Sequence, residues 1–336
     1  NNGDPTDSDG VPLLQASATI IDYKTGQVKV LIGGRGNQPS ASLNRAYFDL
    51  KSIGSTTKPL TVYGPAIDTK LITAGTPLDD TSVSEEILEK YNFGSVVPKN
   101  ADGSMFGYIT AREALTYSKN LTSIKTVDML GLDTALNYGK KAGLKYAPQS
   151  HTMSALALGQ FDQPIGNRDG GNTTILASAY GAFGNNGVIY EPALYTKVED
   201  ASGNLLLEKE PISTKLFSPQ TSYIIYDILK GSSTSAQFND IPVAGKTGTT
   251  NSSDNFWFAG LTPYYSGSVW IGYDNPQRMN GRSSSAASLF SKIMAVAHEG
   301  LEYKDIEKPS GLVEAKVCND SGKSPTDLCY EDQRGN

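Results

Sequence analysis

The sequence predicts an α+β fold, in which a mainly antiparallel sheet is flanked by helices and a separate lobe is all-helical. Two observations support this fold class. Strand-like runs lie near both ends of the 336-residue chain, whereas helical patterns fill its middle. Short turns join most of the neighbouring strands, and strands connected in this way pair antiparallel. A cleft between the two lobes is then the favoured place for a site.

The N-terminal part of the chain supplies the first two strands of the predicted sheet. Residues 16–23 and 27–32 are rich in β-branched side chains, and the tight connection Lys24-Thr25-Gly26 indicates a hairpin. Residues 1–12 contain much Asn, Asp, Gly and Ser, which is typical of a disordered linker. The sheet is therefore expected to begin after this lead-in.

Helical patterns follow from Ser55 onward. A first helix is expected to run to about Tyr63, since Gly64 and Pro65 favour its end. Thr110 and Glu113 have capping-box spacing and begin a helical stretch that extends to residue 143. Residues 73–107 are loop-rich, and further short helices are expected at 84–91, 132–141 and 173–183.

Strand-like runs return in the last third of the chain. A turn at 201–204 lies between strands at 195–199 and 205–207. The other expected elements are helices at 218–229 and 285–298 and strands at 243–249, 255–261 and 267–273. The predicted organisation is a linker at 1–12, a sheet lobe from 13–54 and about 188–307, a helical lobe at about 55–187 and a C-terminal tail at 308–336.

Composition excludes several classes of function. The formal net charge of −6 argues against nucleic acid or an anionic membrane surface as a partner. No stretch has the apolar length of a membrane span. Because the chain starts at Asn1 rather than at methionine, we expect it to be a piece of a longer protein, with any membrane anchor outside it.

Cysteine and histidine are too few for the common metal and triad chemistries. Cys318 and Cys329 are the two cysteines, and the sequence does not decide whether they form a disulfide. Without C-x-x-C or H-E-x-x-H, no metal or cofactor is expected. His151 and His298 are the two histidines, and no serine lies in a G-x-S-x-G elbow, which disfavours a Ser-His-Asp hydrolase.

One stretch nevertheless carries the pattern of a serine nucleophile with a lysine base. Ser55 and Lys58 have the spacing i, i+3, which places both on one face of a helix. Pro59 favours a helix start close by, which would leave Ser55 among free backbone N–H groups. A serine needs such a base to become nucleophilic. The bland alternative is a Ser cap with a solvated lysine.

The partner motif K-T-G occurs twice. Lys24 lies at the tip of the predicted hairpin, where Lys, Thr and Gly are ordinary turn residues. Lys246 lies instead within a strand-like run, followed by Thr247, Gly248 and Thr249. There, Gly248 would let the backbone of a ligand lie close to the strand. We therefore predict Lys246 as the functional lysine.

The partner motif S-x-N occurs four times. Ser42 precedes the helical lobe, Ser202 belongs to a turn between strands, and Ser253 follows Lys246 too closely. Ser118 and Asn120 lie between two helices of the middle lobe, which could face the sheet. Order and context therefore favour Ser118 and Asn120.

With these motifs in this order, the chain resembles the transpeptidase domain of penicillin-binding proteins, most closely the bifunctional class A type. The resemblance covers Ser17 to about Asp327, so 13–307 would be the transpeptidase domain. One departure is Lys119, where Asp is the commoner middle residue, although this position is variable and has no assigned role. The flanking matches are Thr19 to Asp22, Gly54 to Pro59, Ala182 to Gly187, Gly245 to Thr250 and Trp257 to Pro263.

The resemblance implies a penicillin-binding/β-lactamase-like serine transferase fold and a set of roles. Ser55 would attack the carbonyl between two terminal D-alanines of a peptidoglycan stem peptide, and Lys58 would take its proton. Burial and the charge of Lys246 would lower the pKa of Lys58, as a lysine base requires. Ser118 would pass the proton to the leaving amine, and Asn120 would hold the substrate amide.

The resemblance also implies how the substrate is held. Backbone N–H groups of Ser55 and Thr249 would form the oxyanion hole. Lys246 and the hydroxyls of Thr247 and Thr249 would bind the terminal carboxylate. Stem peptides ending in D-Ala-D-Ala and β-lactam antibiotics would be the partners. The location would be the extracellular face of a bacterial membrane, with the anchor and a glycosyltransferase domain outside this chain.

Three alternatives remain at this point. A class A β-lactamase uses a glutamate beyond S-x-N, but no glutamate occurs between Glu113 and Glu191. Hydrolytic relatives without that residue, including a D,D-carboxypeptidase, stay open. A sensor domain that binds β-lactams only to signal would also carry an intact S-x-x-K.

Overall fold

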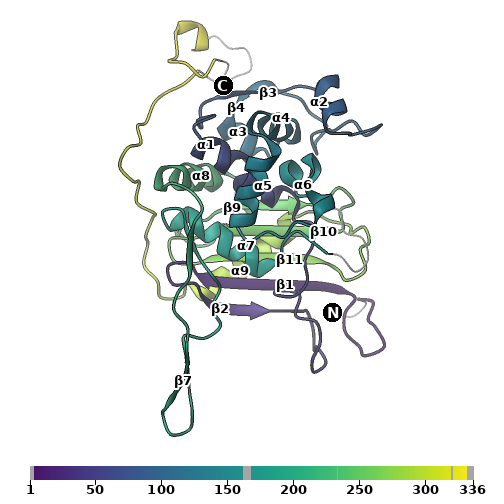
Figure 1. Cartoon of the computed structure of the whole chain (residues 1–336), viewed down its shortest axis with the longest axis vertical. Helices are drawn as coiled ribbons and strands as arrows, with labels where there is room; N and C mark the ends of the chain where they lie inside the picture. The colour runs from purple at the N-terminus through teal and green to yellow at the C-terminus, as the bar shows by residue number, and fades with distance from the viewer. Residues whose placement is uncertain (1–3, 162–167, 233, 319–320, 331–336) are drawn as a thin grey trace.

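A five-stranded antiparallel sheet forms one half of the molecule in the computed structural model, which describes residues 4–161, 168–232, 234–318 and 321–330. Its strand order is β2-β1-β11-β10-β9, so the N-terminal hairpin extends a sheet made by the late strands (Figure 1). All of these strands were predicted from the sequence, and the antiparallel pairing is confirmed. Their bounds are β1 Leu14–Asp22, β2 Gln27–Ile32, β9 Ala244–Thr249, β10 Asn255–Leu261 and β11 Ser266–Tyr273.

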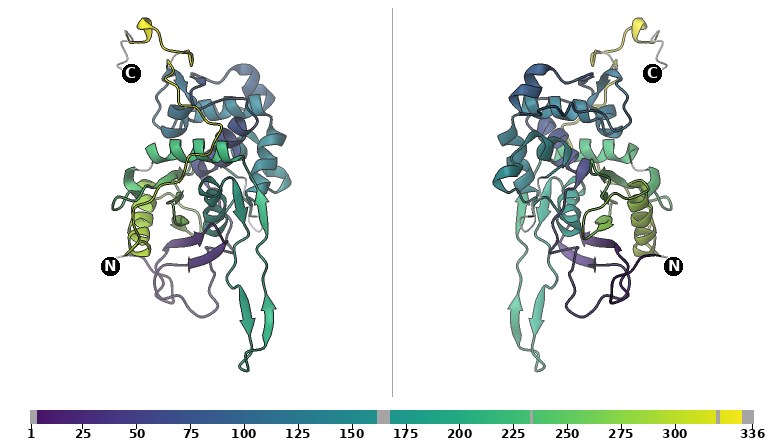
Figure 2. Two further views of the ribbon diagram at one scale, coloured as in Figure 1. Left: turned by 90° about the vertical axis from the view of Figure 1, so that its left-hand side faces the viewer. Right: turned by 90° about the vertical axis from the view of Figure 1, so that its right-hand side faces the viewer.

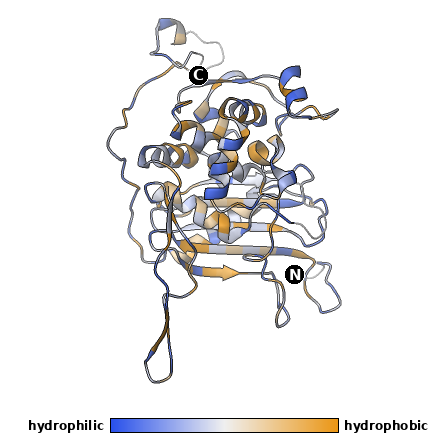
Figure 3. Cartoon of the chain, viewed as in Figure 1, coloured by the Kyte–Doolittle hydropathy of each residue, from blue (hydrophilic) through white to orange (hydrophobic). Residues whose placement is uncertain are grey.

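Helices cover both faces of this sheet. Along β10, Trp257, Ala259 and Leu261 face the larger hydrophobic core, whereas Phe258 faces a smaller one beneath α9 (Ser284–Ala297). This alternation follows from the two-residue period of a strand. On the larger core's side lies α7 (Thr173–Gly181), which the sequence analysis assigned to the helical lobe. Apolar residues concentrate along the strands and in the inner helices (Figure 3).

The other half of the molecule is mainly helical, as predicted, but it is not made of helices alone. Two short strands pair antiparallel here: β3 (Pro77–Asp80) lies within the segment expected to be loop, and β4 (Gly107–Thr110) begins at the end of that segment. The predicted capping box of Thr110 and Glu113 is confirmed. The helices here are α1 Gly64–Asp68, α2 Glu85–Lys90, α3 Ala111–Thr116, α4 Asn120–Leu130, α5 Leu132–Lys141 and α6 Met153–Leu158, with α8 Pro219–Gly231 alongside the sheet.

The helix that starts at residue 54 runs through the centre of the molecule. It begins as a 3₁₀ turn, Gly54–Thr57, widens to a π turn, Pro59–Tyr63, and continues as α1 to Asp68. The predicted end near Tyr63 is therefore wrong. In a regular α-helix, a proline at 65 would clash with the carbonyl four residues before it, and the wider turn relieves this clash.

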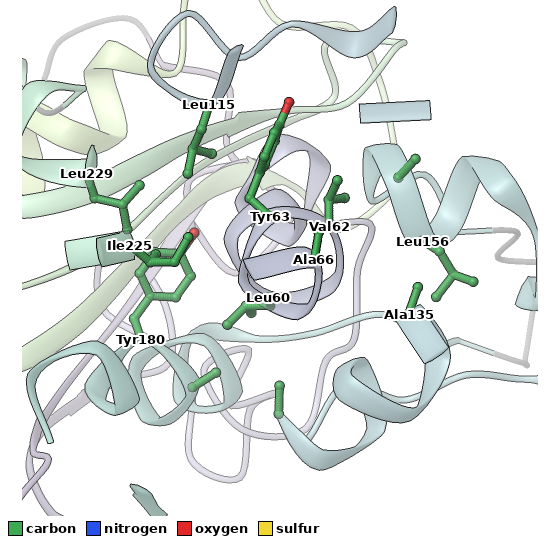
Figure 4. Close-up of a cluster of buried hydrophobic side chains, with 14 of the residues drawn as sticks. Leu60, Val62, Tyr63, Ala66, Leu115, Ala135, Leu156, Tyr180, Ile225 and Leu229 are labelled. Carbon is green, nitrogen blue, oxygen red and sulfur yellow. The ribbon is translucent and has the colours of Figure 1, made fainter. Parts of the chain in front are cut away.

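Core side chains surround this helix on all sides (Figure 4). Leu60, Val62, Tyr63 and Ala66 are fully buried. Their neighbours come from separate elements: Leu115 from α3, Ala135 from α5, Leu156 from α6, Tyr180 from α7 and Ile225 and Leu229 from α8. The helix that carries Ser55 at its start is thus fixed by packing rather than by its own length.

One peripheral arm extends from this body. The predicted hairpin of β6 (Lys197–Glu199) and β7 (Leu205–Glu208) is confirmed and projects as an arm (Figure 2). At its base, β5 (Val188–Tyr190) pairs with β8 (Ser213–Lys215), which the sequence analysis did not predict. Short 3₁₀ turns lie at Pro148–Ser150, Ala182–Gly184, Thr234–Ala236 and Asp327–Tyr330.

The predicted linker and tail both have structure where they are described. Residues 4–12 fold back on themselves, with Thr6 pairing to Pro12. From residue 305 the chain passes along α8, where Gln220 donates a hydrogen bond to the carbonyl of Ser310 at 2.9 Å. Residues 1–3 of the predicted linker and 319–320 and 331–336 of the predicted tail lie outside the described residues. Within the described parts, no helix has the length and apolarity to span a bilayer.

Candidate active site

Ser55 and Lys58 lie on the short helix that opens at Gly54. The backbone N–H of Lys58 donates to the carbonyl of Ser55, so the two residues lie on the same helical turn. Ser55 is partly exposed, whereas Lys58 is fully buried. The predicted arrangement of an accessible hydroxyl and a buried amine on one turn is therefore present, and the alternative of a solvated lysine is wrong.

The amine of Lys58 lies against the predicted S-x-N motif. Lys58 Nζ is 2.7 Å from the carbonyl oxygen of Ser118, 3.1 Å from that of Lys119 and 2.8 Å from Asn120 Oδ1. The hydroxyl oxygen of Ser118 is 3.5 Å away. The structure thus brings Lys58 to Ser118 and Asn120, which lie sixty or more positions after it in the sequence.

Two opposing influences act on the proton of Lys58. Burial lowers its pKa well below the ordinary value, and the charge of Lys246 adds to this effect. Asp80 acts in the opposite direction. The three nearby oxygens also favour the protonated form, because an ammonium can donate to all of them and a neutral amine to only two. Burial and Lys246 therefore favour loss of this proton, whereas the oxygens around Nζ and Asp80 would stabilise the protonated form.

Lys246 is the second buried lysine of the site. It lies on β9, is 3% exposed, and its Nζ is 3.4 Å from the carbonyl of Thr247. Burial lowers its pKa to about 8, so that it carries its charge at neutral pH. Thr247 is partly exposed and Thr249 is exposed on the same strand. A cation beside two accessible hydroxyls suits a carboxylate.

The end of β9 presses against the start of the Ser55 helix. A Cβ on Gly54 would lie 2.5 Å from the carbonyl oxygen of Thr249 and 2.8 Å from its nitrogen. A Cβ on Gly248 would lie inside contact distance of the Ile53 carbonyl and 2.9 Å from the methyl of Thr56. The close approach of the protein's own backbone is thus a second reason for glycine at position 248, and space for a ligand along the strand stays a prediction.

The S-x-N motif adopts a tight turn between α3 and α4. Ser118 has φ of +58°, a left-handed conformation, and Asn120 is the first residue of α4. The amide nitrogen of the Asn120 side chain donates to the carbonyl of Lys99 at 2.9 Å. Its carbonyl oxygen is therefore directed to Lys58, and both ends of the side chain are fixed.

The rejected copies of the motifs lie elsewhere. Lys24 and Ser202 occupy exposed hairpin turns, and Ser42 is exposed in a loop. Asn255, which completes the Ser253 motif, is buried and accepts a hydrogen bond from the Trp270 indole at 2.8 Å. Structural context thus agrees with the choice of Ser118 and Lys246.

Sequence reasoning missed the residues that support this turn. Asn100 accepts a hydrogen bond from the backbone N–H of Asn120 at 2.7 Å and donates to buried Asp80 at 2.7 Å. Lys119, which was given no role, is 1% exposed and directs its side chain toward Asp80 and Asp102. Single polar residues in a loop-rich segment carry no periodic signal, so one sequence alone could not have found them.

The site contains groups suited to acyl transfer. No cluster of three or more His, Cys, Asp or Glu side chains that could hold a metal occurs in the parts of the chain that the structure describes. A nucleophile, a buried amine base and a carboxylate-binding cation are the chemical groups that the arrangement offers.

The chain is similar to known proteins along nearly its whole length. Residues 16–295 match the family model of the penicillin binding protein transpeptidase domain, and residues 308–335 match that of the penicillin-binding protein 1A C-terminal domain. The penicillin-binding protein 1A of Clostridium perfringens is 54% identical over 100% of this chain and 41% of its own length. That of Clostridium tetani is 48% identical over 97% of this chain and 43% of its own. The chain thus spans less than half the length of these relatives.

Solved structures show the same fold. Penicillin-binding protein 1A of Haemophilus influenzae gives a TM-score of 0.78 at 21% identity, covering 96% of this chain and 54% of its own. PonA1 of Mycobacterium tuberculosis, in complex with penicillin V, gives 0.73 at 20% identity, covering 90% of this chain and 82% of its own. The α+β fold with its antiparallel sheet is confirmed.

Proposed function

The chain belongs to the penicillin-binding protein transpeptidase domain family, and from this premise we propose that it is a peptidoglycan D,D-transpeptidase that works through an acyl-enzyme on Ser55. One observation carries the proposal: the amine of Lys58 is buried with a lowered pKa and faces Ser118 and Asn120 one turn from Ser55.

In the first step, Ser55 Oγ forms a bond to the carbonyl carbon of the penultimate D-alanine, and Lys58 Nζ takes the hydroxyl proton. The resulting ammonium donates hydrogen bonds to the carbonyls of Ser118 and Lys119 and to Oδ1 of Asn120. Ser118 Oγ, 3.5 Å from that nitrogen, passes a proton to the terminal D-alanine amine as the C–N bond breaks. The second N–H of the Asn120 amide is left for the substrate.

The developing oxyanion needs donors that are already in place. Backbone N–H groups of Ser55 and Thr249 have this role in the proposal. The close approach of Gly54 to Thr249 supports it, because it brings the two backbone segments side by side. Lys246, with the hydroxyls of Thr247 and Thr249, holds the terminal carboxylate of the stem peptide.

An amine from a neighbouring strand then attacks the acyl-enzyme and forms the cross-link. A D,D-carboxypeptidase would use water instead, and a sensor would stop at the acyl-enzyme. The motifs do not separate these chemistries, but the high identity to penicillin-binding protein 1A over the whole chain favours the transpeptidase.

Stem peptides ending in D-Ala-D-Ala and β-lactams are the proposed partners. The PonA1 structure, which shares the fold, contains penicillin V. A β-lactam would acylate Ser55 in the same way as the peptide. Since this substrate is a cell-wall polymer, we place the domain on the extracellular face of a bacterial membrane.

Labelling with a fluorescent penicillin tests the nucleophile. We expect a long-lived adduct in the wild-type protein, none in Ser55→Ala, and full labelling in the control Ser42→Ala, which changes the exposed serine of a rejected motif. An adduct that persists in Ser55→Ala would refute the site, and rapid loss of label would indicate a hydrolase.

A second assay tests the acceptor. A stem-peptide donor is incubated with an amine acceptor, and the cross-linked product is measured by mass spectrometry. We expect cross-linked product that disappears in Ser55→Ala. Only hydrolysed donor would identify a carboxypeptidase, and acylation without either product would identify a sensor.

A further inference from the structure

We propose that Asp80 is a positioning residue of the site: from β3, it fixes the Ser118–Asn120 turn through Asn100 and Lys119 and sets the electrostatic field at the Lys58 amine. The inference rests on the proposed function, because it assigns Asp80 an influence on the base of that reaction. Asp80 lies in the segment that was expected to be loop, and its side chain contacts Asn100, Phe106 and Lys119.

Asp80 is the fully buried centre of a polar network. Its Oδ1 accepts a hydrogen bond from the side-chain amide of Asn100 at 2.7 Å, and its Oδ2 accepts one from the backbone N–H of Phe106 at 3.0 Å. Lys119 Nζ lies 3.7 Å from Oδ2. A carboxylate without exposure is tolerated only with such partners. The network therefore fixes where residues 100 and 106 lie.

Asn100 transmits this position to the active-site turn. While its amide nitrogen donates to Asp80, its oxygen accepts from the backbone N–H groups of Asn120 at 2.7 Å and Leu121 at 3.2 Å. These are the first N–H groups of α4, which lack partners inside the helix. Asn100 thus caps α4 from a distant loop, and Asn120 starts at a defined place.

The side chain of Lys119 anchors the other side of the same turn. Its side chain is buried, with Nζ 2.6 Å from Ser104 Oγ, 3.1 Å from Asp102 Oδ2 and 3.5 Å from the ring centre of Phe106. Its carbonyl points the opposite way and accepts from Lys58. The left-handed φ of Ser118 is strained for a serine, and anchors on both sides of it stabilise that conformation.

Asp80 also acts on Lys58 through its charge. Lys246 on β9 and Asp80 on β3 are the charges that act on the Lys58 amine; Lys246 lowers the pKa of Lys58 and Asp80 raises it. The Lys119 ammonium faces Asp80, and Lys119 meets Lys58 through its backbone. Burial raises the pKa of Tyr63, and the charge of Asp80 raises it further. Asp80 thus moderates the loss of proton affinity that burial and Lys246 produce.

The test is the pH profile of Ser55 acylation by fluorescent penicillin in Asp80→Asn, which keeps the shape and removes the charge. Lys58 is active when neutral, so the rate rises as pH passes its pKa. Without Asp80 this pKa falls, and the rising limb moves to lower pH by about half to one pH unit. Relative to each protein's plateau, the variant is then about three- to tenfold faster below the wild-type midpoint.

Two variants separate charge from geometry. Asp79→Asn is the matched control, because this neighbouring carboxylate points outward to Lys125 at 2.8 Å and its removal should leave the midpoint unchanged. Asn100→Ala removes the cap without removing a charge, so the plateau should fall while the midpoint stays.

The outcomes can be told apart. A wild-type protein that is not labelled, or label that survives in Ser55→Ala, overturns the proposed function itself. A labelled Asp80→Asn with the wild-type midpoint overturns the inference alone. If Asp80→Asn does not fold, the double variant Asp80→Asn, Lys119→Met is compared with Lys119→Met alone, and equal midpoints in these two proteins overturn the inference equally.

Discussion

Replacing Gly54 by alanine tests whether contact between β9 and the Ser55 helix builds the oxyanion hole. Gly54 has φ of +55°, which an L side chain rarely adopts. The added Cβ would also lie 2.5 Å from the Thr249 carbonyl oxygen and 2.8 Å from the Thr249 nitrogen. These contacts are with backbone atoms, which cannot rotate away as a flexible side chain can. The two segments must therefore separate.

The expected loss of stability has two parts. A left-handed conformation costs a non-glycine residue about 1–2 kcal/mol. Overpacking against backbone costs about a further 1–3 kcal/mol. The site should respond more strongly, because separation moves the Ser55 and Thr249 N–H groups apart, and loss of one oxyanion donor slows acyl transfer by about 10²–10³-fold.

Gly94→Ala is the matched control. Gly94 has φ of +59°, nearly that of Gly54, but nothing lies within 4 Å of its Cβ position. The free energy of unfolding of Gly94→Ala should therefore fall by only about 1–2 kcal/mol, and its acylation rate should stay unchanged. Urea denaturation gives the free energy of unfolding, and stopped-flow labelling with fluorescent penicillin gives the rate. Equal stability and equal labelling rates in both variants would refute the reasoning.

The remaining predictions concern the buried polar groups of the site. Lys246→Met should raise the free energy of unfolding at pH 7 by up to about 3 kcal/mol, which corresponds to the difference between a pKa of 10.5 and about 8, and abolish acylation. Wild-type stability should rise between pH 8 and 10.5, where the unfolded chain binds the proton that folded Lys246 has lost; a flat profile in urea denaturation would contradict this. Lys246→Arg, if it still labels, should keep binding carboxylate-bearing penicillins above pH 8, where the wild type weakens. Tyr180→Phe should lower the free energy of unfolding by about 1 kcal/mol, because the buried Thr56 carbonyl loses the hydroxyl that donates to it at 2.8 Å. Calorimetry measures this loss of stability.

Much of the fold was predictable because its signals are local. The strands β1, β2, β9, β10 and β11 appear as apolar runs bounded by turn residues, and the structure confirms each of them. The helix after Ser55 was predicted too short because a local rule about Gly64 and Pro65 was overridden by tertiary packing. A buried helix with neighbours on every side can adopt a π turn to accommodate a proline.

The candidate site was predictable only in part. Motif order and setting located Ser55, Ser118 and Lys246, since each rejected copy lay in a turn or loop. The contacts of Asp80 and Asn100 with the motif join residues 20–40 positions apart in sequence, and no periodicity marks such pairs. The contact of Gly248 with Ile53 was not predicted for the same reason, because Ile53 lies far away in the sequence.

The two buried lysines show why the site needs so much support. Each cation loses hydration on burial, and Lys58 and Lys246 also repel one another. A protein selected for stability alone would replace them by apolar residues, which is often neutral or stabilising. Their cost is balanced by Asp80, by the oxygens of Ser118 to Asn120 and by the fully packed helix that follows Ser55. Activity and stability should therefore change in opposite directions at Lys246, whereas at Asp80, where compensation itself is removed, stability should fall and the pH dependence of acylation should move.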